Sequence, residues 1–514
     1  MSKTIIIIGA GLAGLSAALQ AAENGCNVKL VSSLPSERAQ SVMAEGGINA
    51  ALNTKDENDS PEEHFTDTIK AACGLADPNA VWGMTQAAPE LVHWLLKLGV
   101  KFNMSGYDDV DLRNFGGQKK KRTAFAQSDT GKQIMTAMID AVRRKEASGM
   151  VERFSHHSFL TLRLCDNICC GCVIRDEYSQ ETVELPGDAV IVATGGMHGL
   201  FGNTTGSLSN TGEVTAELFR LGVPLANGEM IQYHPTTVKC GGKRMLISEA
   251  ARGEGGRLFA MKDGKQWYFM EEKYPELGNL MPRDITAREI WKVSHESEVF
   301  LDMTEISEEI ISNKLSGLAD DCMTYLHKDI RKEPVSVLPG IHYFMGGILV
   351  DEQHRTPIQN LYAAGECCAQ YHGANRLGGN SLLGALYGGR VAAKSACEQA
   401  DAVDLSCATQ IDFPPASQIS EIKQLNKVMQ ETMGVVRNEN TLLNGIQTVQ
   451  ALTGNLPLLG MAVLKSALAR KESRGAHWRE DYPKSNDDDY LKTTVARFDG
   501  KQIQISFVPV PERR

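Results

Sequence analysis

Residues 4–16, TIIIIGAGLAGLS, constrain the fold of this chain more than any other stretch. A run of four isoleucines leads into Gly9-x-Gly11-x-x-Gly14 and then into an alanine-rich apolar segment, which predicts a buried strand, a tight turn and the start of a helix. In such a unit Gly9 permits the turn, Gly11 lets the backbone approach a pyrophosphate, and Gly14 lets the helix pack on the strand. The helix N-terminus favours the negative charge of the phosphates. The stretch therefore predicts a dinucleotide site in an α/β fold.

The strand predicted next, at 27–31, does not end in the acidic residue that usually binds the adenosine ribose. Ser32 and Ser33 follow it instead. A serine hydroxyl can still hydrogen-bond a ribose hydroxyl, so this position leaves the kind of dinucleotide open.

Length and composition narrow the class of protein. At 514 residues the chain is long enough for about three domains, and its 42% hydrophobic and 23% charged residues are ordinary for a globular protein. A net charge of −10 argues against nucleic-acid binding. We find no apolar run long enough to span a membrane and no secretion leader. The expected location is the cytoplasm, or the cytoplasmic face of a membrane through partner subunits.

The twelve cysteines lack the spacing of a small disulfide scaffold, which favours a reducing compartment. Four of them cluster at Cys165, Cys169, Cys170 and Cys172, where a CxxC pattern allows a metal site. The same residues also fit a β-hairpin with its turn at 166–167. Because no second CxxC completes a four-sulfur set, we favour the hairpin and expect no metal.

Apolar periodicity and turn residues predict further elements along the chain. The Gly46-Gly47 pair suggests backbone that passes close to a flat ligand, and the basic run 119–122 is predicted to be a solvated loop. Polar stretches dominate from about 230 to 340, which predicts an inserted domain. Mostly amphipathic helix is expected after 392, with a short β-like tail at 502–510. The other expected elements are helices at 63–73, 89–98, 131–145 and 213–219, and a second buried strand at 188–196.

Nine motifs occur in a fixed order: AEGG (44–47), RNFGG…KRTAFAQSDTG (113–131), QYHPT (232–236), SEAARGEGG (248–256), PRD (282–284), HYFMGG (342–347), AAGE (363–366), HGANRLGGNSL (372–382) and RKESRGAH (470–477). Together they resemble the flavoprotein subunits of the succinate dehydrogenase and fumarate reductase family, whose superfamily includes L-aspartate oxidase. The resemblance implies an α/β, Rossmann-like FAD-binding domain, split by an inserted α+β capping domain and followed by a C-terminal helical domain. The implied boundaries are 1–229 and 341–395 for the FAD-binding domain, 230–340 for the cap and 396–514 for the C-terminal domain.

The resemblance also implies roles for individual residues. FAD would be held by Gly9, Gly11, Gly14, Ser32, Ser41, Gly46, Gly47, Glu213, Glu366, Ser381 and Leu382. The substrate carboxylates would be bound by His234, Ser248, His342 and Arg376. Arg283 would donate a proton, with Glu249 and Arg252 relaying it from solvent.

The implied reaction converts fumarate to succinate, which needs a hydride at one carbon of the double bond and a proton at the other. Arginine suits the binding of both carboxylates, because its guanidinium makes two parallel bonds to a carboxylate. Arginine is an unusual acid, since its pKa lies above about 12, so a neighbour must resupply its proton in a water-excluded site. Glu249 and Arg252, three residues apart, would lie on one face of a helical turn.

Two departures from the family pattern matter. Membrane-bound members link FAD to a histidine in an R-S-H-T context, whereas this chain has Arg38-Ala39-Gln40-Ser41. Gln40 cannot form that bond, so FAD is expected to be noncovalent, which favours fumarate reduction over succinate oxidation. The resemblance implies an iron–sulfur electron-transfer subunit as partner, although the helical region before residue 470 is shorter than in the membrane-bound complexes.

Two other functions compete with fumarate reduction. L-aspartate oxidase also binds FAD noncovalently and has a similar RESRG motif, but it has a glutamate at position 115 to meet the substrate ammonium. This chain has Phe115, which cannot pair with an ammonium. A flavin-binding electron conduit would not need the full set of carboxylate-binding residues. Fumarate reductase is therefore the favoured prediction and L-aspartate oxidase the alternative.

Overall fold

A five-stranded parallel sheet organises the structure, a computed structural model that describes residues 2–106, 109–401, 411, 413 and 418–514. Its strand order is β20-β10-β1-β2-β6, and every pairing is parallel. The strands are β1 (Thr4–Ile8), β2 (Asn27–Ser32), β6 (Val151–Ser155), β10 (Ala189–Val192) and β20 (Leu361–Ala363). Because β20 lies beyond residue 340, the sheet is completed by chain from both sides of the 230–340 segment.

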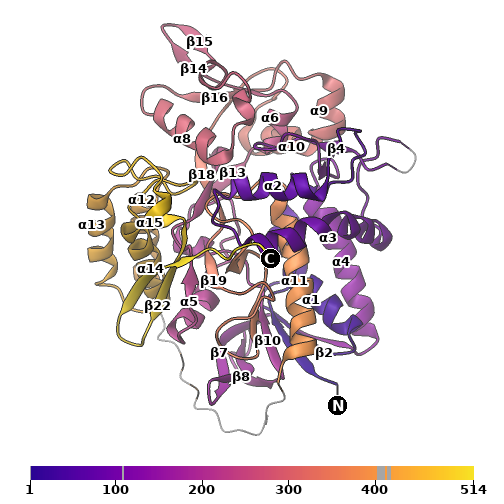
Figure 1. The fold of residues 1–514 in the computed structure, drawn as a ribbon. Helices are drawn as coiled ribbons and strands as arrows, with labels where there is room; N and C mark the ends of the chain where they lie inside the picture. Colours follow the sequence, from indigo (N-terminus) through magenta and orange to yellow (C-terminus); the bar gives the residue numbers. More distant parts are fainter. Residues whose placement is uncertain (1, 107–108, 402–410, 412, 414–417) are drawn as a thin grey trace.

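The four isoleucines explain why β1 stands at the centre of this sheet. Ile5 and Ile7 join the core beneath four helices, while Ile6 and Ile8 join a core on the opposite face. Successive side chains of a strand point to opposite faces, so a strand covered on both faces needs an unbroken apolar run. The helices are α1 (Leu12–Glu23), α3 (Pro78–Leu98), α4 (Thr130–Ala147) and α11 (Asn380–Gln399), gathered on one side of the molecule in Figure 1.

The cysteine cluster lies in a β-hairpin, which confirms the hairpin interpretation. β7 (His157–Cys165) and β8 (Ile168–Asp176) are joined by Asp166 and Asn167, whose φ angles of 49° and 65° lie in the left-handed region that these residue types tolerate. β9 (Thr182–Pro186) adds a third strand. Burial raises the pKa of the Cys169 thiol to about 12, which disfavours the thiolate that a metal would need.

The predicted helices at 63–73, 89–98 and 131–145 are α2 (Pro61–Ala71), α3 and α4. The predicted start at Pro89 was wrong, because α3 begins at Pro78 and contains Pro89. Its buried face continues through Met84 and Ala88. Burial of that face outweighs the backbone hydrogen bond that a proline removes.

Residues 230–340 combine strands and helices around a core that includes Ile247, Leu258 and Leu301. One sheet contains β12 (Ile231–Cys240), β13 (Lys243–Leu246) and β18 (Leu338–Phe344); another contains β14 (Arg257–Lys262), β15 (Lys265–Trp267), β16 (Val299–Asp302) and β17 (Val335–Ser336). The helices are α6 (Glu249–Gly253), α7 (Phe269–Lys273), α8 (Arg283–Val293), α9 (Glu308–Lys314) and α10 (Ser316–Asp321). Figure 1 shows this segment at one end of the molecule.

The C-terminal region is helical only in part. The helices α12 (Ile419–Thr432), α13 (Glu439–Val449), α14 (Asn455–Ala469) and α15 (Asp487–Tyr490) precede the strands β22 (Lys492–Phe498) and β23 (Ile503–Pro509). The predicted tail is therefore one strand of a hairpin. β22 pairs with β11 (Leu225–Ala226), in a sheet with β19 (Gly347–Leu349) and β21 (Cys368–Ala369). Positions 402–410, 412 and 414–417 of the predicted helical region lie outside the described residues.

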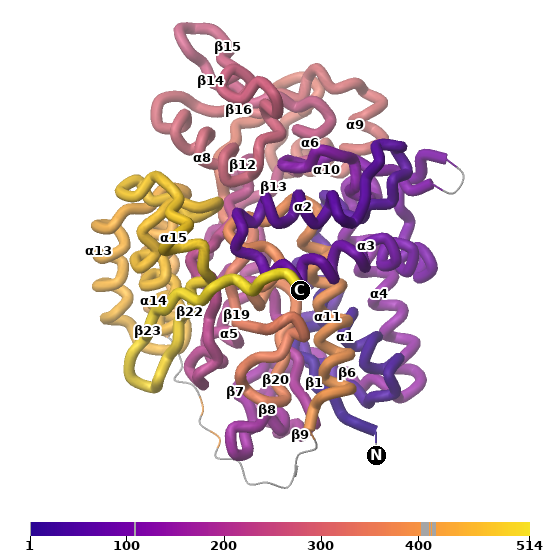
Figure 2. The backbone as a smooth tube through the Cα atoms, in the orientation of Figure 1, coloured from indigo at the N-terminus to yellow at the C-terminus, as the bar shows by residue number. Residues whose placement is uncertain are grey.

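The last residues of the chain cross the molecule. Figure 2 traces the segment after β23 from the C-terminal helices towards α3. There the Arg513 guanidinium lies 3.8 Å from the centroid of the Trp82 ring, and Asn79 bonds the backbone of Glu512 and Arg514. In the part of the chain that the structure describes, no helix combines the length and apolar character that crossing a bilayer requires.

Candidate active site

A large cavity lies at the carboxyl ends of β1, β2, β10 and β20. Its volume is about 880 Å³, within the range of about 300–1,000 Å³ that is typical of ligand sites. In an open parallel sheet this is the edge at which ligands bind. Residues of the 230–340 segment complete the wall, so the cavity joins two parts of the fold.

The turn between β1 and α1 has the geometry of a pyrophosphate cradle. Gly9 has a φ of 111°, and a Cβ there would lie 2.3 Å from the carbonyl oxygen of Ala193. A Cβ on Gly14 would lie 1.8 Å from the carbonyl oxygen of Gly9, so only glycine lets α1 pack this closely on β1. At Gly11 the nearest atom would be 3.6 Å away, which leaves this backbone open to the cavity. Gly9 and Gly14 thus have the turn and packing roles that the motif predicts, and Gly11 leaves room for a ligand to approach the backbone.

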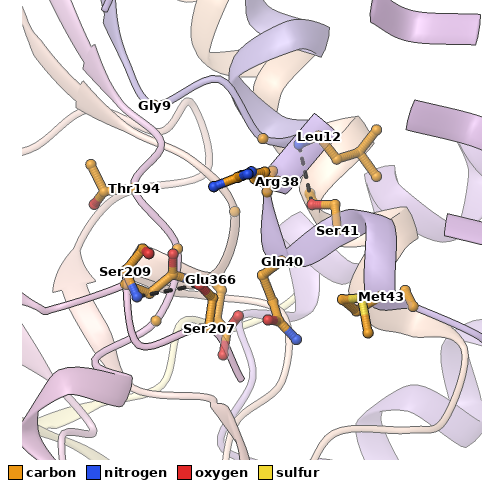
Figure 3. Close-up of a pocket in the computed structure, with 18 of the residues that line it drawn as sticks. Gly9, Leu12, Arg38, Gln40, Ser41, Met43, Thr194, Ser207, Ser209 and Glu366 are labelled. Atoms are coloured by element: carbon orange, nitrogen blue, oxygen red, sulfur yellow. Dashed lines mark hydrogen bonds between the residues drawn. The ribbon is translucent and has the colours of Figure 1, made fainter. Parts of the chain in front are cut away.

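All predicted cofactor residues except Gly14 line the cavity. At the start of α1 the Leu12 N–H donates to the Ser41 hydroxyl at 3.2 Å, as Figure 3 shows. The Ser32 hydroxyl is buried and has no hydrogen-bond partner among the described residues, as expected of a group that a ligand satisfies. The lining residues of this set are Gly9, Gly11, Ser32, Ser41, Gly46, Gly47, Glu213 at the start of α5 (Glu213–Arg220), Glu366, Ser381 and Leu382.

The Gly46-Gly47 pair is required by protein packing as well as by the cavity. A Cβ on Gly46 would lie 2.8 Å from the Phe115 ring. Gly47 has a φ of 135°, and a Cβ there would lie 2.5 Å from the carbonyl oxygen of Ala124 in β5 (Thr123–Ala124). Both glycines also line the cavity. Their backbone is therefore held between the protein interior and the ligand space.

Glu366 lies where the end of β20 meets the cavity. Its Oε1 accepts a hydrogen bond from the Phe344 N–H at 3.1 Å and lies 3.7 Å from Nε2 of His198. A carboxylate therefore stands at the end of β20, three strands away from β2, and faces a different part of the cavity from Ser32.

The two predicted substrate histidines stand on the neighbouring strands β12 and β18. The ring centroids of His234 and His342 are 5.1 Å apart. Nδ1 of His342 lies 2.8 Å from the Thr205 hydroxyl, and Nδ1 of His234 lies 3.1 Å from the Thr236 carbonyl oxygen. Burial, reinforced by nearby arginine charges, lowers the pKa of both rings well below the ordinary value. Both are therefore neutral hydrogen-bonding groups at neutral pH.

The three predicted catalytic residues form one buried chain of charges. Arg283, at the start of α8, donates from Nε and Nη2 to Oε2 of Glu249, at 2.8 and 2.5 Å. Oε1 of Glu249 lies 3.3 Å from Nη2 of Arg252, on the same face of α6, as the spacing of the two residues predicts. Burial acts to raise the pKa of Glu249, but the two guanidiniums outweigh it and the pKa is lowered. Glu249 is therefore a carboxylate between two cations.

Arg376 carries a buried charge without a carboxylate partner among the described residues. Its guanidinium lies 4.3 Å from the centroid of the Tyr343 ring, and its buried Nε has no hydrogen-bond partner in that part of the chain. Burial and the charge of Arg283 lower the pKa of Arg376 to about 9. Both arginines line the cavity, which therefore favours an anionic ligand.

The remaining predicted residues fall on either side of Glu249. Ser248 is the N-cap of α6, where its hydroxyl accepts from the Ala250 N–H at 3.4 Å, and it lines the cavity. Arg252 is the only predicted substrate-binding or catalytic residue that does not line the cavity; it lies behind Glu249 and donates to the carbonyl oxygen of Asn279 at 2.6 Å.

Sequence reasoning missed several charged residues that line the cavity, among them Glu45 and Arg38. Burial, with the nearby charge of Asp321, raises the pKa of Glu45 to about 8. Arg38 lies near Ser41 in Figure 3 and adds a cation near the glycine turn. Glu45 belongs to the AEGG motif and Arg38 to the stretch around Gln40. Their positions in the sequence were a signal, but only the fold shows that they face the cavity.

Comparison with known proteins identifies the cofactor. A model described as an FAD binding domain matches residues 4–382, and one described as the fumarate reductase flavoprotein C-terminus matches 452–513. The succinate dehydrogenase flavoprotein subunit of Bacillus subtilis is 38% identical, covering all of this chain and 98% of its own length. The 8-methylmenaquinol:fumarate reductase flavoprotein subunit of Wolinella succinogenes is 32% identical, covering all of this chain and 92% of its own.

Solved structures agree on the fold. E. coli quinol fumarate reductase matches with a TM-score of 0.89 at 27% identity, over 99% of this chain and 97% of that one. Mycobacterium smegmatis Sdh1 matches with a TM-score of 0.84 at 29% identity, over all of this chain and 95% of that one. The predicted fold class is confirmed. The glycine cradle and the unpartnered Ser32 hydroxyl fit FAD, and the chain is an FAD-dependent oxidoreductase. It belongs to the family of succinate dehydrogenase and fumarate reductase flavoprotein subunits.

Proposed function

We propose that this chain is the flavoprotein subunit of a fumarate reductase and works in the direction of succinate. The observation that carries the proposal is that Arg283, Arg376, His234 and His342 line the same cavity as the glycine cradle. When bound, FAD supplies the hydride that reduces one carbon of the double bond. The residues of this chain hold the dicarboxylate and supply the proton.

The charges at the substrate end of the cavity suit a dianion. Within the cluster of Arg376, Arg283, Glu249 and Arg252 behind it, three positive charges and one negative charge leave two positive charges, and the neighbouring histidines are neutral. Fumarate brings two negative charges. In a site of low dielectric, matched charges avoid the large cost of an unpaired buried ion.

We propose Arg283 as the proton donor. It lines the cavity with only 7% of its side chain exposed, in a position where water competes little for its protons. Glu249 and Arg252 resupply the proton from behind. The lowered pKa of Glu249 keeps it a carboxylate at neutral pH, so it is able to accept a proton from Arg252 and hand it to Arg283 after Arg283 has donated its own.

We propose that FAD binds without a covalent link. Gln40 lines the cavity, and the sequence resemblance sets it where membrane-bound members have the linking histidine. The nitrogen of its amide is a poor nucleophile because its lone pair is delocalised into the carbonyl. Loss of the link is expected to lower the flavin potential, which favours reduction of fumarate.

We propose that residues 230–340 form a cap over the substrate. His234, Ser248, Glu249 and Arg283 belong to this segment, whereas Arg376 lies beyond it. The active site is therefore complete only when the cap meets the FAD-binding domain, which we divide as 1–229 and 341–395. Residues 396–514 form the C-terminal domain.

We propose a partner subunit that passes electrons to this chain through iron–sulfur centres. The relatives described above are named as flavoprotein subunits, which indicates assembly with other chains. Such an assembly would place this chain in the cytoplasm or at the cytoplasmic face of a membrane.

L-Aspartate oxidation is the less favoured alternative. Phe115 is 2% exposed, packs against Gly46 and lines the cavity. An apolar ring at this position offers no partner to the substrate ammonium, and an unpaired ammonium in a closed site is costly.

Turnover by the purified holoprotein tests the proposal. With a reduced viologen dye as electron source, we expect oxidation of the dye that depends on fumarate. With L-aspartate and oxygen, we expect no hydrogen peroxide. A dye that stays reduced in the presence of fumarate, or peroxide formed from aspartate, would overturn the assignment.

A further inference from the structure

A buried amide links the guanidinium of Arg283 to the backbone of Arg376. Gln232 stands on β12 and is fully buried. Its Oε1 accepts a hydrogen bond from Nη1 of Arg283 at 3.1 Å. Its Nε2 donates to the backbone carbonyl oxygen of Arg376 at 2.8 Å and to Oδ1 of Asn375 at 3.0 Å. One side chain thus joins the start of α8 to the segment that leads into α11.

These partners determine how the amide of Gln232 is oriented. A guanidinium only donates, so it must meet Oε1, and a backbone carbonyl only accepts, so it must meet Nε2. A glutamate here would place a carboxylate oxygen against the carbonyl oxygens of Arg376 and Asn375. Glutamine matches both sides, because one end accepts and the other donates.

Gln232 also completes the contacts of Arg283. Glu249 accepts from Nε and Nη2 of this guanidinium, and Gln232 accepts from Nη1, so all three nitrogens are bonded and the plane of the group is fixed. Because Gln232 is neutral, it holds Arg283 without cancelling a second positive charge of the site.

We propose that Gln232 is a positioning residue that sets the spacing between Arg283 and Arg376 and directs the proton of Arg283. The inference rests on the proposed fumarate reduction. A small shift of Arg283 harms proton transfer more than binding, because transfer needs the donor within hydrogen-bond reach of one carbon. Attraction of a dianion tolerates such a shift, since Coulomb energy changes slowly with distance.

The main test is Gln232→Met, which removes both polar ends of the side chain and keeps its length. The matched control is Gln370→Met, the same change at another buried glutamine, whose amide donates to the carbonyl oxygen of Asp351 instead of joining the two arginine segments. Each holoprotein is assayed for FAD content, for kcat and KM with fumarate and reduced viologen, and for malonate Kd by flavin absorbance. For Gln232→Met we expect a kcat about 10- to 100-fold below the control, the effect of losing one hydrogen bond to a charged group. We expect full FAD content and a malonate Kd within about threefold of the control.

Two further variants separate positioning from a merely structural role. Gln232→Glu adds a negative charge beside Arg283 and is expected to weaken malonate binding about tenfold. Combining Gln232→Met with Arg283→Ala should lower kcat no further than Arg283→Ala does alone, because Gln232 acts through Arg283.

The outcomes that overturn the inference are distinct. A kcat for Gln232→Met equal to that of Gln370→Met would remove the role, and so would a loss of FAD as large as the loss of kcat. Wild-type protein that fails to reduce fumarate would overturn the proposed function, and this inference with it. Wild-type turnover that Gln232→Met leaves undiminished would overturn this inference alone.

Discussion

The two guanidiniums of the cavity differ in how their charges are balanced. Arg283 lies 2.5 Å from a carboxylate oxygen of Glu249, whereas Arg376 has the Tyr343 ring as its neighbour. A buried cation without a counter-ion costs several kcal/mol, and a bound carboxylate offsets that cost. The lowered pKa of Arg376 reflects this cost in the free protein. Ligand binding and the ionisation of Arg376 are therefore coupled.

Binding of a dianion is expected to weaken as the pH rises through about 9. Below that pH Arg376 is protonated and attracts the ligand; above it the free protein holds a neutral Arg376, so affinity falls by about tenfold per pH unit. Glu45, whose pKa is raised to about 8, ionises on the way and adds repulsion. Malonate titrations followed by flavin absorbance from about pH 7 to about pH 10 measure the effect.

Glu45→Gln is the control for this pH profile. It should remove the change near pH 8 and leave the change near pH 9. A malonate affinity that stays constant over the whole range would contradict the coupling of Arg376 to the ligand.

Replacement of Arg283 tests the proton donor. Arg283→Ala is expected to lower kcat for fumarate reduction by about 10²- to 10⁴-fold, the usual contribution of a general acid. FAD should stay bound, because the glycine cradle is built from β1 and α1. Steady-state assays and the absorbance ratio of flavin to protein check both statements. Arg283→Lys keeps the charge but not the geometry, so recovery of full activity in that variant would argue against a specific role for the guanidinium.

At the scale of elements, two glycines at the junction of β1 and α1 are expected to have different roles: Gly14 in folding and Gly11 in FAD binding. Gly14→Ala would place a methyl group 1.8 Å from the Gly9 carbonyl oxygen, so α1 must move off β1. We expect a loss of stability of about 1–3 kcal/mol or more, the cost of overpacking, together with lost FAD. Gly11→Ala meets its nearest atom at 3.6 Å, so the apoprotein should unfold as the wild type does while FAD affinity falls. Thermal unfolding of the apoprotein and FAD titration by fluorescence quenching distinguish the two variants; equal loss of stability in both would contradict this division.

Elements with strong local signals could be predicted from the sequence, and those decided by distant packing could not. The run Ile5–Ile8 with its glycine turn, and the hairpin at 157–176, follow from period and turn residues alone. The prediction that a helix begins at Pro89 was wrong, because burial along α3 outweighs the tendency of a proline to interrupt a helix. Only one strand of the tail was predicted, because its partner β22 has a less distinct sequence pattern. The position of β22 depends on pairing with the distant β11.

Arg122 shows the same limit in a single side chain. The basic run 119–122 was predicted to be solvated, and for Arg122 this was wrong. Arg122 is fully buried and lies 2.8 Å from Asp59 and 2.9 Å from Asp67. Asp59 lies just before α2 and Asp67 lies within it. In the sequence Arg122 stands next to other cations, and nothing there indicates that these distant carboxylates pair with it.

At the scale of the whole molecule, the residues of the candidate site could be named from motifs, but their contacts could not. The motifs place Glu249, Arg283 and Arg376 far apart in sequence, and the fold brings them to one cavity. The contacts of Gln232 with both arginine segments depend on how the 230–340 segment meets the rest of the chain. Gln232 belongs to the QYHPT motif, but no periodic or compositional signal shows which segments its side chain bridges, so its contacts appear only in the structure.

Retention of a noncovalent FAD is expected to depend on the fold of the whole protein. If Gln40 replaces a covalent link, FAD is retained only by the folded walls of the cavity, which come from segments as distant as Gly11 and Ser381. Acid precipitation destroys those walls together, so all the yellow colour should pass into the supernatant. A tryptic peptide spanning residue 40 should show its unmodified mass. Added FAD should raise the unfolding temperature with its concentration, because a dissociable ligand stabilises the native state by mass action. Colour that remains in the washed pellet, or a flavin adduct on any peptide, would show that another residue forms the link.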